Sequence, residues 1–295
     1  SRQLYYPNSN PVGVALGGGR ARQYDLDNTT GTIQTLLTYN RPFGDNNTLD
    51  VMGGYEYNKF SQNLFMAEGI GFITDAFSFN KLDAAKTRND SSFAQDWKLV
   101  SFLSRANLGF KDKYFVTAIL RYDGSSKFAD GHKWAAFPGL SASWRISGED
   151  FMSGSTFSDL RLRLGWGRQG NPGIAPYQSL VQFTGSTGAN YPWGDSPSSG
   201  VIPVSNGNPE LKWEQTDQYN LGVDFGLAGN RLAGSVDYYV KNTKDLLLNV
   251  QVPPPSFAST SLMNVGELKN SGLELSLDWL AISKPSLTWR AGLEV

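Results

Sequence analysis

The stretch D-L-R-L-R-L-G-W-G-R at residues 159–168 decides the fold class of this chain. Apolar residues alternate in it with polar or small ones, and the apolar set is Leu160, Leu162, Leu164 and Trp166. Successive side chains of a strand point to opposite faces, so the pattern predicts a strand with one apolar and one polar face. A helix would distribute the same leucines around its circumference. The leucines then face either the core of a soluble sheet or the lipid around a transmembrane barrel.

Composition favours the barrel. Only 18% of the 295 residues are charged, compared with about 25% in average soluble proteins. Aromatic residues reach 13%, which suits strands with aromatic belts. The chain has no Cys, which excludes disulfides and thiolate metal sites, and its net charge of −1 without a basic run points to no nucleic-acid partner. No stretch approaches the ~18 apolar residues of a membrane helix, an absence that excludes helical spans only.

The same alternation recurs along the chain and predicts about ten strands. They lie at 32–39, 49–58, 105–110, 114–123, 140–146, 160–166, 219–225, 232–240, 273–279 and 287–295. Residues 1–31 are rich in Gly, Asn and Pro and are predicted to form a loop. Residues 59–96 show no clean alternation and are predicted to be a long connection.

The predicted connections differ in length in a regular way. Short ones, at 41–48, 111–113, 147–158, 227–230 and 281–286, alternate with mostly long ones at 59–96, 124–133, 169–210 and 250–263. The connection at 147–158 has room for one helical turn. Antiparallel strands joined in this way place the short turns at one end and the long loops at the other, as in outer-membrane barrels. We therefore predict an all-β, antiparallel, up-and-down transmembrane β-barrel.

Large aromatic residues agree with two interfacial girdles. Phe110, Tyr114 and Phe225 lie beside predicted short turns, and the set at the long-loop ends is Tyr57, Tyr122, Trp166 and Tyr219. Amphipathic rings concentrate at the two membrane interfaces of a barrel. Aromatic residues also favour strands of any kind, so the girdles support the membrane interpretation without proving it.

Motifs for other chemistry are weak. Residues 165–170 match G-x-G-x-x-G, but Pro172 and Gly173 follow where a dinucleotide site needs a helix. Asp25 and Asp27 begin a calcium-like spacing that lacks the glycine and the bidentate glutamate of such loops. His132 is the only histidine, which excludes a multi-His metal site and leaves one candidate base for a hydrolase. We expect no enzyme, no metal and no cofactor.

The polar faces of the predicted strands carry charges of both signs. We expect these side chains to form ion pairs across neighbouring strands and to line a wet lumen, with contacts to substrate or to a plug domain left open. The residues predicted to line the lumen are Arg105, Arg121, Asp123, Arg145, Arg161, Arg163, Asp224, Asp237 and Glu274.

One long loop, 169–210, combines aromatic rings with polar neighbours. Such a surface suits sugar or peptide recognition, since a ring offers an apolar face beside hydrogen-bonding groups. The same rings could equally pack the loop on itself or against a partner. The predicted substrate contacts are Tyr177, Tyr191, Trp193 and Asp195.

Several blocks resemble the SusC/RagA family of TonB-dependent outer-membrane transporters. They include F-L-S-R-A-N-L-G-F-K-D-K-Y-F-V-T-A-I-L-R-Y-D-G-S-S at 102–126, F-P-G-L-S-A-S-W-R-I-S at 137–147, G-W-G-R-Q-G-N at 165–171 and N-P-E-L-K-W-E-Q-T-D-Q-Y-N-L-G-V-D-F at 208–225. Two further blocks lie at 230–248 and 264–275. The order and spacing of the blocks are specific, and the likeness covers mainly residues 98–280.

The resemblance implies a barrel of about 22 strands around a plugged lumen. It also implies TonB-energised import of oligosaccharides or peptides, a SusD-like surface lipoprotein as partner, and a location in the outer membrane. Residues 1–295 show no plug domain, TonB box or signal peptide, so we expect a partial barrel domain from the centre to the late part of a longer chain. A passive porin and a soluble all-β carbohydrate-binding or adhesion module remain the alternatives.

Overall fold

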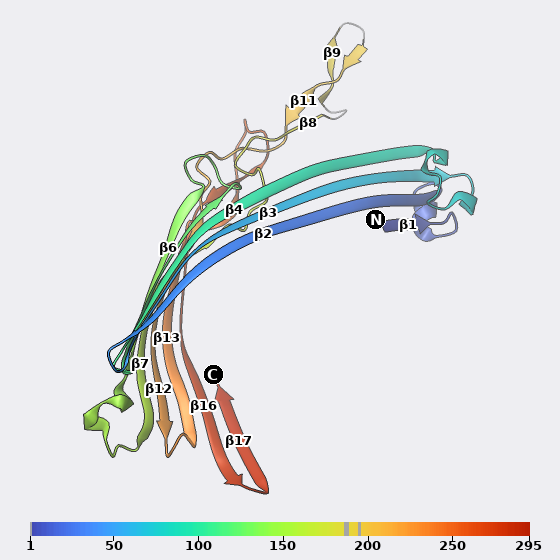
Figure 1. The fold of residues 1–295 in the computed structure, drawn as a ribbon. Coiled ribbons are helices and arrows are strands. Elements are labelled where there is room, and N and C mark those ends of the chain that lie inside the picture. Colours follow the sequence, from blue (N-terminus) through green and yellow to red (C-terminus); the bar gives the residue numbers. More distant parts are fainter. Residues whose placement is uncertain (1, 186–188, 194–195) are drawn as a thin grey trace. The chain divides into compact units, whose positions relative to one another are not determined.

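A computed structural model describes residues 2–185, 189–193 and 196–295. Its main element is an 11-stranded sheet in which the strands follow one another in chain order (Figure 1). The neighbouring strands from β4 to β17 pair antiparallel. No described helix is long and apolar enough to cross a bilayer. The strands of this sheet are β1 (Arg2–Tyr6), β2 (Gly19–Phe43), β3 (Asn47–Phe72), β4 (Thr87–Phe110), β5 (Tyr114–Ser125), β6 (Trp134–Arg145), β7 (Phe157–Asn171), β12 (Glu214–Leu227), β13 (Leu232–Lys244), β16 (Glu267–Lys284) and β17 (Leu287–Glu294).

The predicted all-β antiparallel architecture is confirmed. Each predicted strand lies inside an observed strand of the sheet, from β2 to β17, apart from end residues such as Ile146 and Val295. The connection between β6 and β7 contains two short 3-10 helices, η3 (Ile146–Gly148) and η4 (Asp150–Met152), where one helical turn was expected. Period-two alternation located these strands because their two faces differ in polarity.

The N-terminal third departs from the prediction. Residues 1–31, predicted as a loop, contain β1, the short helix α1 (Pro11–Ala15) and the first part of β2. The predicted long connection at 59–96 is wrong as well, because β3 continues to Phe72 and β4 begins at Thr87. Two 3-10 helices, η1 (Asp75–Phe77) and η2 (Leu82–Ala84), lie between these strands. Tyr57 therefore lies within β3 and not at a loop end. Both faces of these segments are rich in polar residues, so the alternation of polarity that reveals a strand is missing.

Two predicted long loops also contain short hairpins. Between β13 and β16, β14 (Leu247–Gln251) pairs with β15 (Thr260–Asn264). Between β7 and β12, β8 (Phe183–Gly185) pairs with β11 (Val201–Pro203), and β9 (Tyr191–Trp193) pairs with β10 (Ser196–Ser198).

The chain divides into two compact units. The first comprises Ser1–Ile33 and Asn58–Lys98, and it has a small core of Ala21, Phe72 and Ala85. In it, buried Glu68 accepts hydrogen bonds from Arg20, Arg22 and Asn89. A carboxylate removed from water needs such partners, because an unpaired buried charge is costly.

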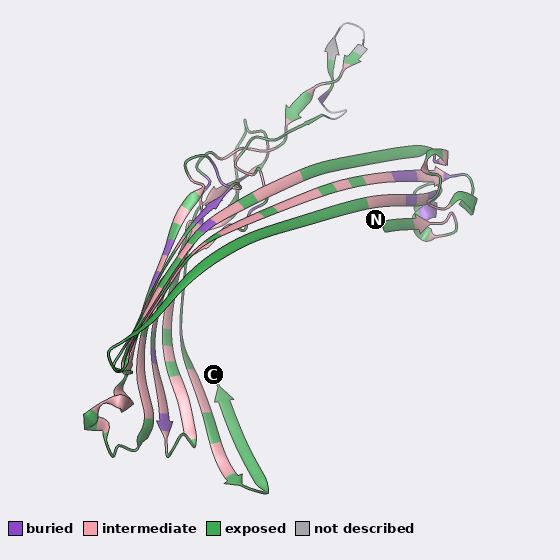
Figure 2. Ribbon diagram, viewed as in Figure 1, coloured by how far each residue is buried: buried purple, intermediate pink, exposed green. Residues whose placement is uncertain are grey.

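The second unit comprises Gln34–Tyr57 and Leu99–Val295. Rings gather on the apolar face of its strands in two clusters. Near the short turns, the ring of Tyr114 lies 6.4 Å from the rings of both Phe110 and Trp144. Near the long loops, Trp134 stacks with Tyr122 at 5.0 Å and with Phe102 at 6.2 Å. β17, at one end of the strand order, is exposed along its whole length (Figure 2).

Candidate functional site

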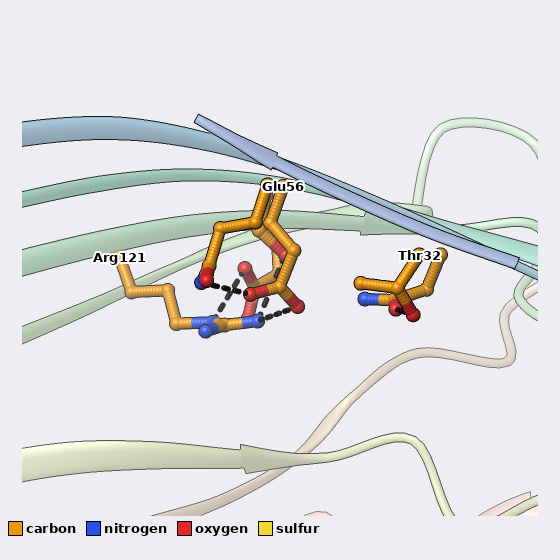
Figure 3. A network of polar contacts seen from close by, with 7 residues as sticks. Thr32, Glu56 and Arg121 are labelled. Atoms are coloured by element: carbon orange, nitrogen blue, oxygen red, sulfur yellow. Dashed lines mark hydrogen bonds and ion pairs between the residues drawn. The ribbon is translucent and has the colours of Figure 1, made fainter. Parts of the chain in front are cut away.

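A polar network on the second unit is centred on Arg121 of β5 (Figure 3). Its Nε atom donates to both carboxylate oxygens of Asp123, at 2.8 and 2.7 Å, and Nη2 donates to Ser101 Oγ at 2.9 Å. Glu56 of β3 approaches the same guanidinium at 3.8 Å and accepts from Gln34 of β2 at 3.0 Å. Asp123 and Ser101 are buried. The network therefore links β2, β3, β4 and β5 on one face of the sheet.

A second network joins β7, β12 and β13. Arg163 forms a bidentate pair with Asp224, with Nε–Oδ2 and Nη2–Oδ1 distances of 2.8 and 2.7 Å. Its Nη2 also donates to Asp237 at 3.0 Å. Bidentate charge-assisted pairs are the strongest side-chain hydrogen bonds and fix geometry as well as charge.

A glycine makes the second network possible. Gly222 of β12 is the register partner of Arg163 on one side and of Asp237 on the other. A Cβ atom at Gly222 would lie 2.3 Å from Asp237 Oδ1 and 2.9 Å from the guanidinium carbon of Arg163. The absent side chain leaves the space through which the arginine reaches across an intervening strand.

The other predicted polar-face residues lie apart from these two networks. The side chain of Arg105 lies 3.4 Å from the carboxylate of Asp50. The same carboxylate accepts a hydrogen bond from Asn107 at 3.0 Å. Arg161 lies over the ring of Phe115, 6.0 Å from its centroid. Arg145 lies at the end of β6, and Glu274 of β16 is the register partner of Asp237. Among the described residues, neither Arg145 nor Glu274 takes part in an ion pair.

A shallow hollow lies on the same face of β5, β6, β7 and β12. Its volume is about 260 Å³, and Gly139, Gly165 and Gly167 contribute to its lining. Thr117, Gln218 and Asn220 add hydroxyl and amide groups to this lining. A Cβ at Gly165 or Gly167 would meet its nearest neighbour only at 3.8 or 4.0 Å, so the backbone there is open to a ligand.

The long loops share an apolar core. We call their described residues, 126–133, 172–185, 189–193, 196–213 and 245–266, the loop assembly. Its apolar core contains Phe128, Ile174, Leu211 and Trp213, together with Phe137 of β6. The ring of Trp213 lies 4.8 Å from Phe128 and 5.3 Å from Phe137. The blocks that carry the family resemblance, at 102–126, 137–147 and 208–225, adjoin or supply this core.

Asparagine amides tie the parts of the loop assembly together. Asn264 of β15 accepts from the main-chain N–H of Lys212 at 2.9 Å and donates to the Lys212 carbonyl at 2.8 Å. Asn208 donates to the carbonyl of Leu262 at 2.9 Å, and Asn206 donates to those of Ala258 and Thr260. Main-chain N–H and C=O groups outside the large sheet thus form hydrogen bonds with side chains, as buried polar groups require.

The predicted substrate contacts lie in this loop region but on separate elements. Tyr177 follows β7 and has a positive φ of 65°, and its carbonyl accepts from Leu180 at 3.0 Å. Tyr191 lies in β9 and is half exposed, with its ring against Gly200. The backbone of Trp193 also lies in β9, whereas Asp195 lies outside the described residues.

At the opposite end of the strands, Glu149 joins two short turns. Its carboxylate accepts from Lys113 Nζ at 2.8 Å, from Tyr114 Oη at 2.7 Å and from Trp144 Nε1 at 3.0 Å. The hydrogen bonds from Lys113, Tyr114 and Trp144 lower the pKa of Glu149 from 4.5 to about 2. This arrangement holds the two turns together.

Sequence reasoning missed several members of these networks. Glu56 lies on the polar face of a predicted strand, so its alternation with Tyr55 and Tyr57 was an available signal. Ser101 precedes the first residue predicted for its strand, and Gly222 carries no side chain to mark it. Within residues 2–185, 189–193 and 196–295, no group of three or more His, Asp or Glu side chains is placed to hold a metal ion.

Comparisons with known proteins agree with this architecture. The family model "TonB dependent receptor-like, beta-barrel" matches residues 1–294. The chain is 36% identical over 288 residues to TonB-dependent receptor P3 of Formosa agariphila, covering 97% of this chain and 28% of that protein. It is also 36% identical over 247 residues to TonB-dependent receptor SusC of Bacteroides thetaiotaomicron, covering 82% of this chain and 24% of that one.

A solved structure of the RagAB peptide importer in a closed-closed state superimposes with a TM-score of 0.86 at 26% identity, over 99% of this chain and 32% of that one. The chain therefore spans 24–32% of the length of these relatives. The relatives are named as receptors and an importer, and none is named as an enzyme. Together with the sheet, these matches show that the chain belongs to the family of TonB-dependent receptor β-barrels of the outer membrane.

Proposed function

We propose that this chain forms part of a SusC/RagA-type outer-membrane importer that takes up oligosaccharides or peptides with energy supplied through TonB. The observation that carries the proposal is the division of the sheet into one apolar and one polar face. One face bears aromatic clusters and leucines suited to lipid, and the other bears fixed polar networks around Arg121 and Arg163. A barrel wall that guides polar cargo through an apolar membrane requires this division.

The charged residues predicted from the sequence line the lumen in this proposal, from Arg105 on β4 to Glu274 on β16. A cysteine-accessibility experiment tests the assignment residue by residue. Glu274→Cys in the full-length protein reacts with a water-soluble maleimide, whereas the neighbouring Leu273→Cys on the opposite face stays protected by lipid. Equal labelling of both positions contradicts a lipid-facing and a water-facing side.

The loop residues Tyr177, Tyr191, Trp193 and Asp195 contact substrate in this proposal, and a SusD-like lipoprotein covers the same end of the barrel. Support comes from the named relative SusC and from the RagAB structure, described as a peptide importer. The loop assembly offers rings and amides on a scaffold with its own core, which suits recognition.

Uptake in cells tests the function as a whole. Cells that carry the full-length gene take up labelled oligosaccharides or peptides, and deletion of tonB abolishes that uptake. Uptake that persists without TonB identifies a passive porin. Co-purification of a surface lipoprotein with the full-length protein tests the partner, and a protein that purifies without one in every detergent contradicts it.

A further inference from the structure

The first unit contains parts of β2, β3 and β4 whose two faces differ in chemistry. Within residues 24–32, 58–66 and 87–98, alternate residues place the charged side chains on one face. The residues of this charged face are Asp25, Asp27, Lys59, Arg88, Asp90, Asp96 and Lys98. The other face has no charged residue between Tyr24 and Thr32 on β2, and it presents amides, hydroxyls and rings.

Contacts across the strands organise the uncharged face. Gln62 Nε2 donates to Asn28 Oδ1 at 2.8 Å, and Gln95 Nε2 donates to Gln62 Oε1 at 2.5 Å. This row of amides crosses β2, β3 and β4. Beside it, the rings of Phe60 and Trp97 stack with their centroids 5.8 Å apart and an angle of 21° between their planes. We call these five residues the amide–aromatic platform.

The platform keeps hydrogen-bonding capacity for a ligand. Each primary amide has two N–H donors and a carbonyl acceptor. The bonds within the row use one donor of Gln62 and one of Gln95, and among the described residues the Gln95 Oε1 and Asn28 Nδ2 atoms have no partner. Since the amides already brace one another, a ligand would bind without having to order them first.

These parts of the strands belong in water. β2 has 25 residues, β3 has 26 and β4 has 24, whereas a strand that crosses the bilayer needs only about 9–11. The charged face could not contact hydrocarbon, because an exposed charge on the lipid side of a barrel is destabilising. The platform is therefore open to solutes.

We propose that the amide–aromatic platform binds a neutral oligosaccharide, an inference that rests on the proposed role in nutrient import. A sugar ring offers C–H groups that pack on an aromatic face and hydroxyls that both donate to and accept from amides. The five platform side chains carry no charge, and the side chains of Arg20, Arg22 and Glu68 farther along the same face pair with one another. A peptide would bring charged ends and side chains that the platform leaves unpaired.

Binding to the purified full-length protein in detergent tests the platform. The probes are neutral oligosaccharides of glucose, galactose, mannose and xylose, measured by titration calorimetry. At least one binds to the wild type, and Trp97→Ala weakens its binding by about tenfold because the stacking surface is lost. Gln62→Leu keeps the size of the side chain and removes its hydrogen bonds, and it weakens the binding of the same sugar. Phe65→Ala, on the charged face of the same strand and 57% exposed, leaves binding unchanged.

Three results would overturn the inference. The first is that none of these sugars binds. The second is that Trp97→Ala and Gln62→Leu bind the sugar as tightly as the wild type, or that Phe65→Ala weakens sugar binding as much as they do. The third is that a charged peptide, and not a sugar, loses affinity in Trp97→Ala. Uptake by the wild type is measured in parallel. If that uptake depends on TonB, the importer proposal holds even when the platform inference fails. If uptake does not depend on TonB, only the importer proposal is contradicted.

Discussion

The indole Nε1 of Trp213 donates a hydrogen bond of 2.9 Å to the main-chain carbonyl oxygen of Lys133. The two residues are 80 positions apart, and the contact joins the segment before β12 to the residue preceding β6. The same carbonyl accepts from the N–H of Ser125 at 3.0 Å. Trp213 thus anchors the loop assembly to the end of the sheet through both packing and a directed bond.

Variants of Trp213 separate these two contributions. Trp213→Phe keeps most of the ring and leaves Lys133 with one remaining partner, so a loss of about 1 kcal/mol is expected. Trp213→Ala also empties a site that is 3% exposed, and about 3–5 kcal/mol is expected for such a cavity. Urea unfolding of the full-length protein measures both. Val201→Ala, at a position that is 70% exposed, serves as the control and changes little. Equal losses for Phe and Ala would show that packing around Trp213 is unimportant.

A methyl group at Gly222 should disrupt the network around Arg163. In Gly222→Ala the new Cβ meets Asp237 Oδ1 at 2.3 Å, so the carboxylate must move away from the arginine. The expected loss is about 1–3 kcal/mol, typical of overpacking. Gly165→Ala is the matched control on the same face, since its Cβ meets nothing closer than 3.8 Å. Thermal unfolding in detergent compares the two, and an equal shift in Tm would contradict the role assigned to Gly222.

Asn264 should control the order of the loop assembly. Asn264→Asp removes the two donors that reach the carbonyls of Lys212 and Asp245, at 2.8 and 3.0 Å, and turns a carboxylate oxygen toward them. We expect a local loss of about 1–3 kcal/mol, seen as faster hydrogen exchange at the N–H of Val265, which donates to the Leu246 carbonyl beside the lost bond. Asn249→Asp on the exposed side of β14 should leave that exchange unchanged. Protection that is the same in both variants would rule out this role.

The pKa of Glu149 predicts a pH dependence. Its pKa falls from 4.5 to about 2 in the folded protein, so the carboxylate stabilises the fold above pH 4.5 and loses this effect as the pH drops toward 2. Glu149→Gln should therefore lower the Tm by a constant amount at neutral pH. The difference from wild type should shrink between pH 4.5 and 2. A difference in Tm that does not depend on pH would assign the effect to packing and not to charge.

The sequence alone determined the sheet strands β5, β6, β7, β12, β13, β16 and β17, their alternating faces and the position of the short turns. It could do so because a half-buried strand must alternate in polarity, and residues such as Leu160 to Trp166 show that period directly. The blocks that resemble the SusC/RagA family also indicated the family from the sequence. The sequence showed which residues of the polar faces are charged, but it did not show which of them form ion pairs with one another.

Tertiary structure decided the rest. The first unit stayed hidden because its strands have polar residues on both faces. On β2, for example, Asp25 and Asp27 lie on one face and Asn28 on the other. Leu211 is fully buried in a segment rich in Gly, Pro and Ser. Its burial depends on Phe128, Ile174 and Trp213, which reach it from distant points of the chain. The pairing of Arg163 with Asp224 and Asp237 likewise depended on strand register, because a shift of one residue would turn each side chain to the opposite face.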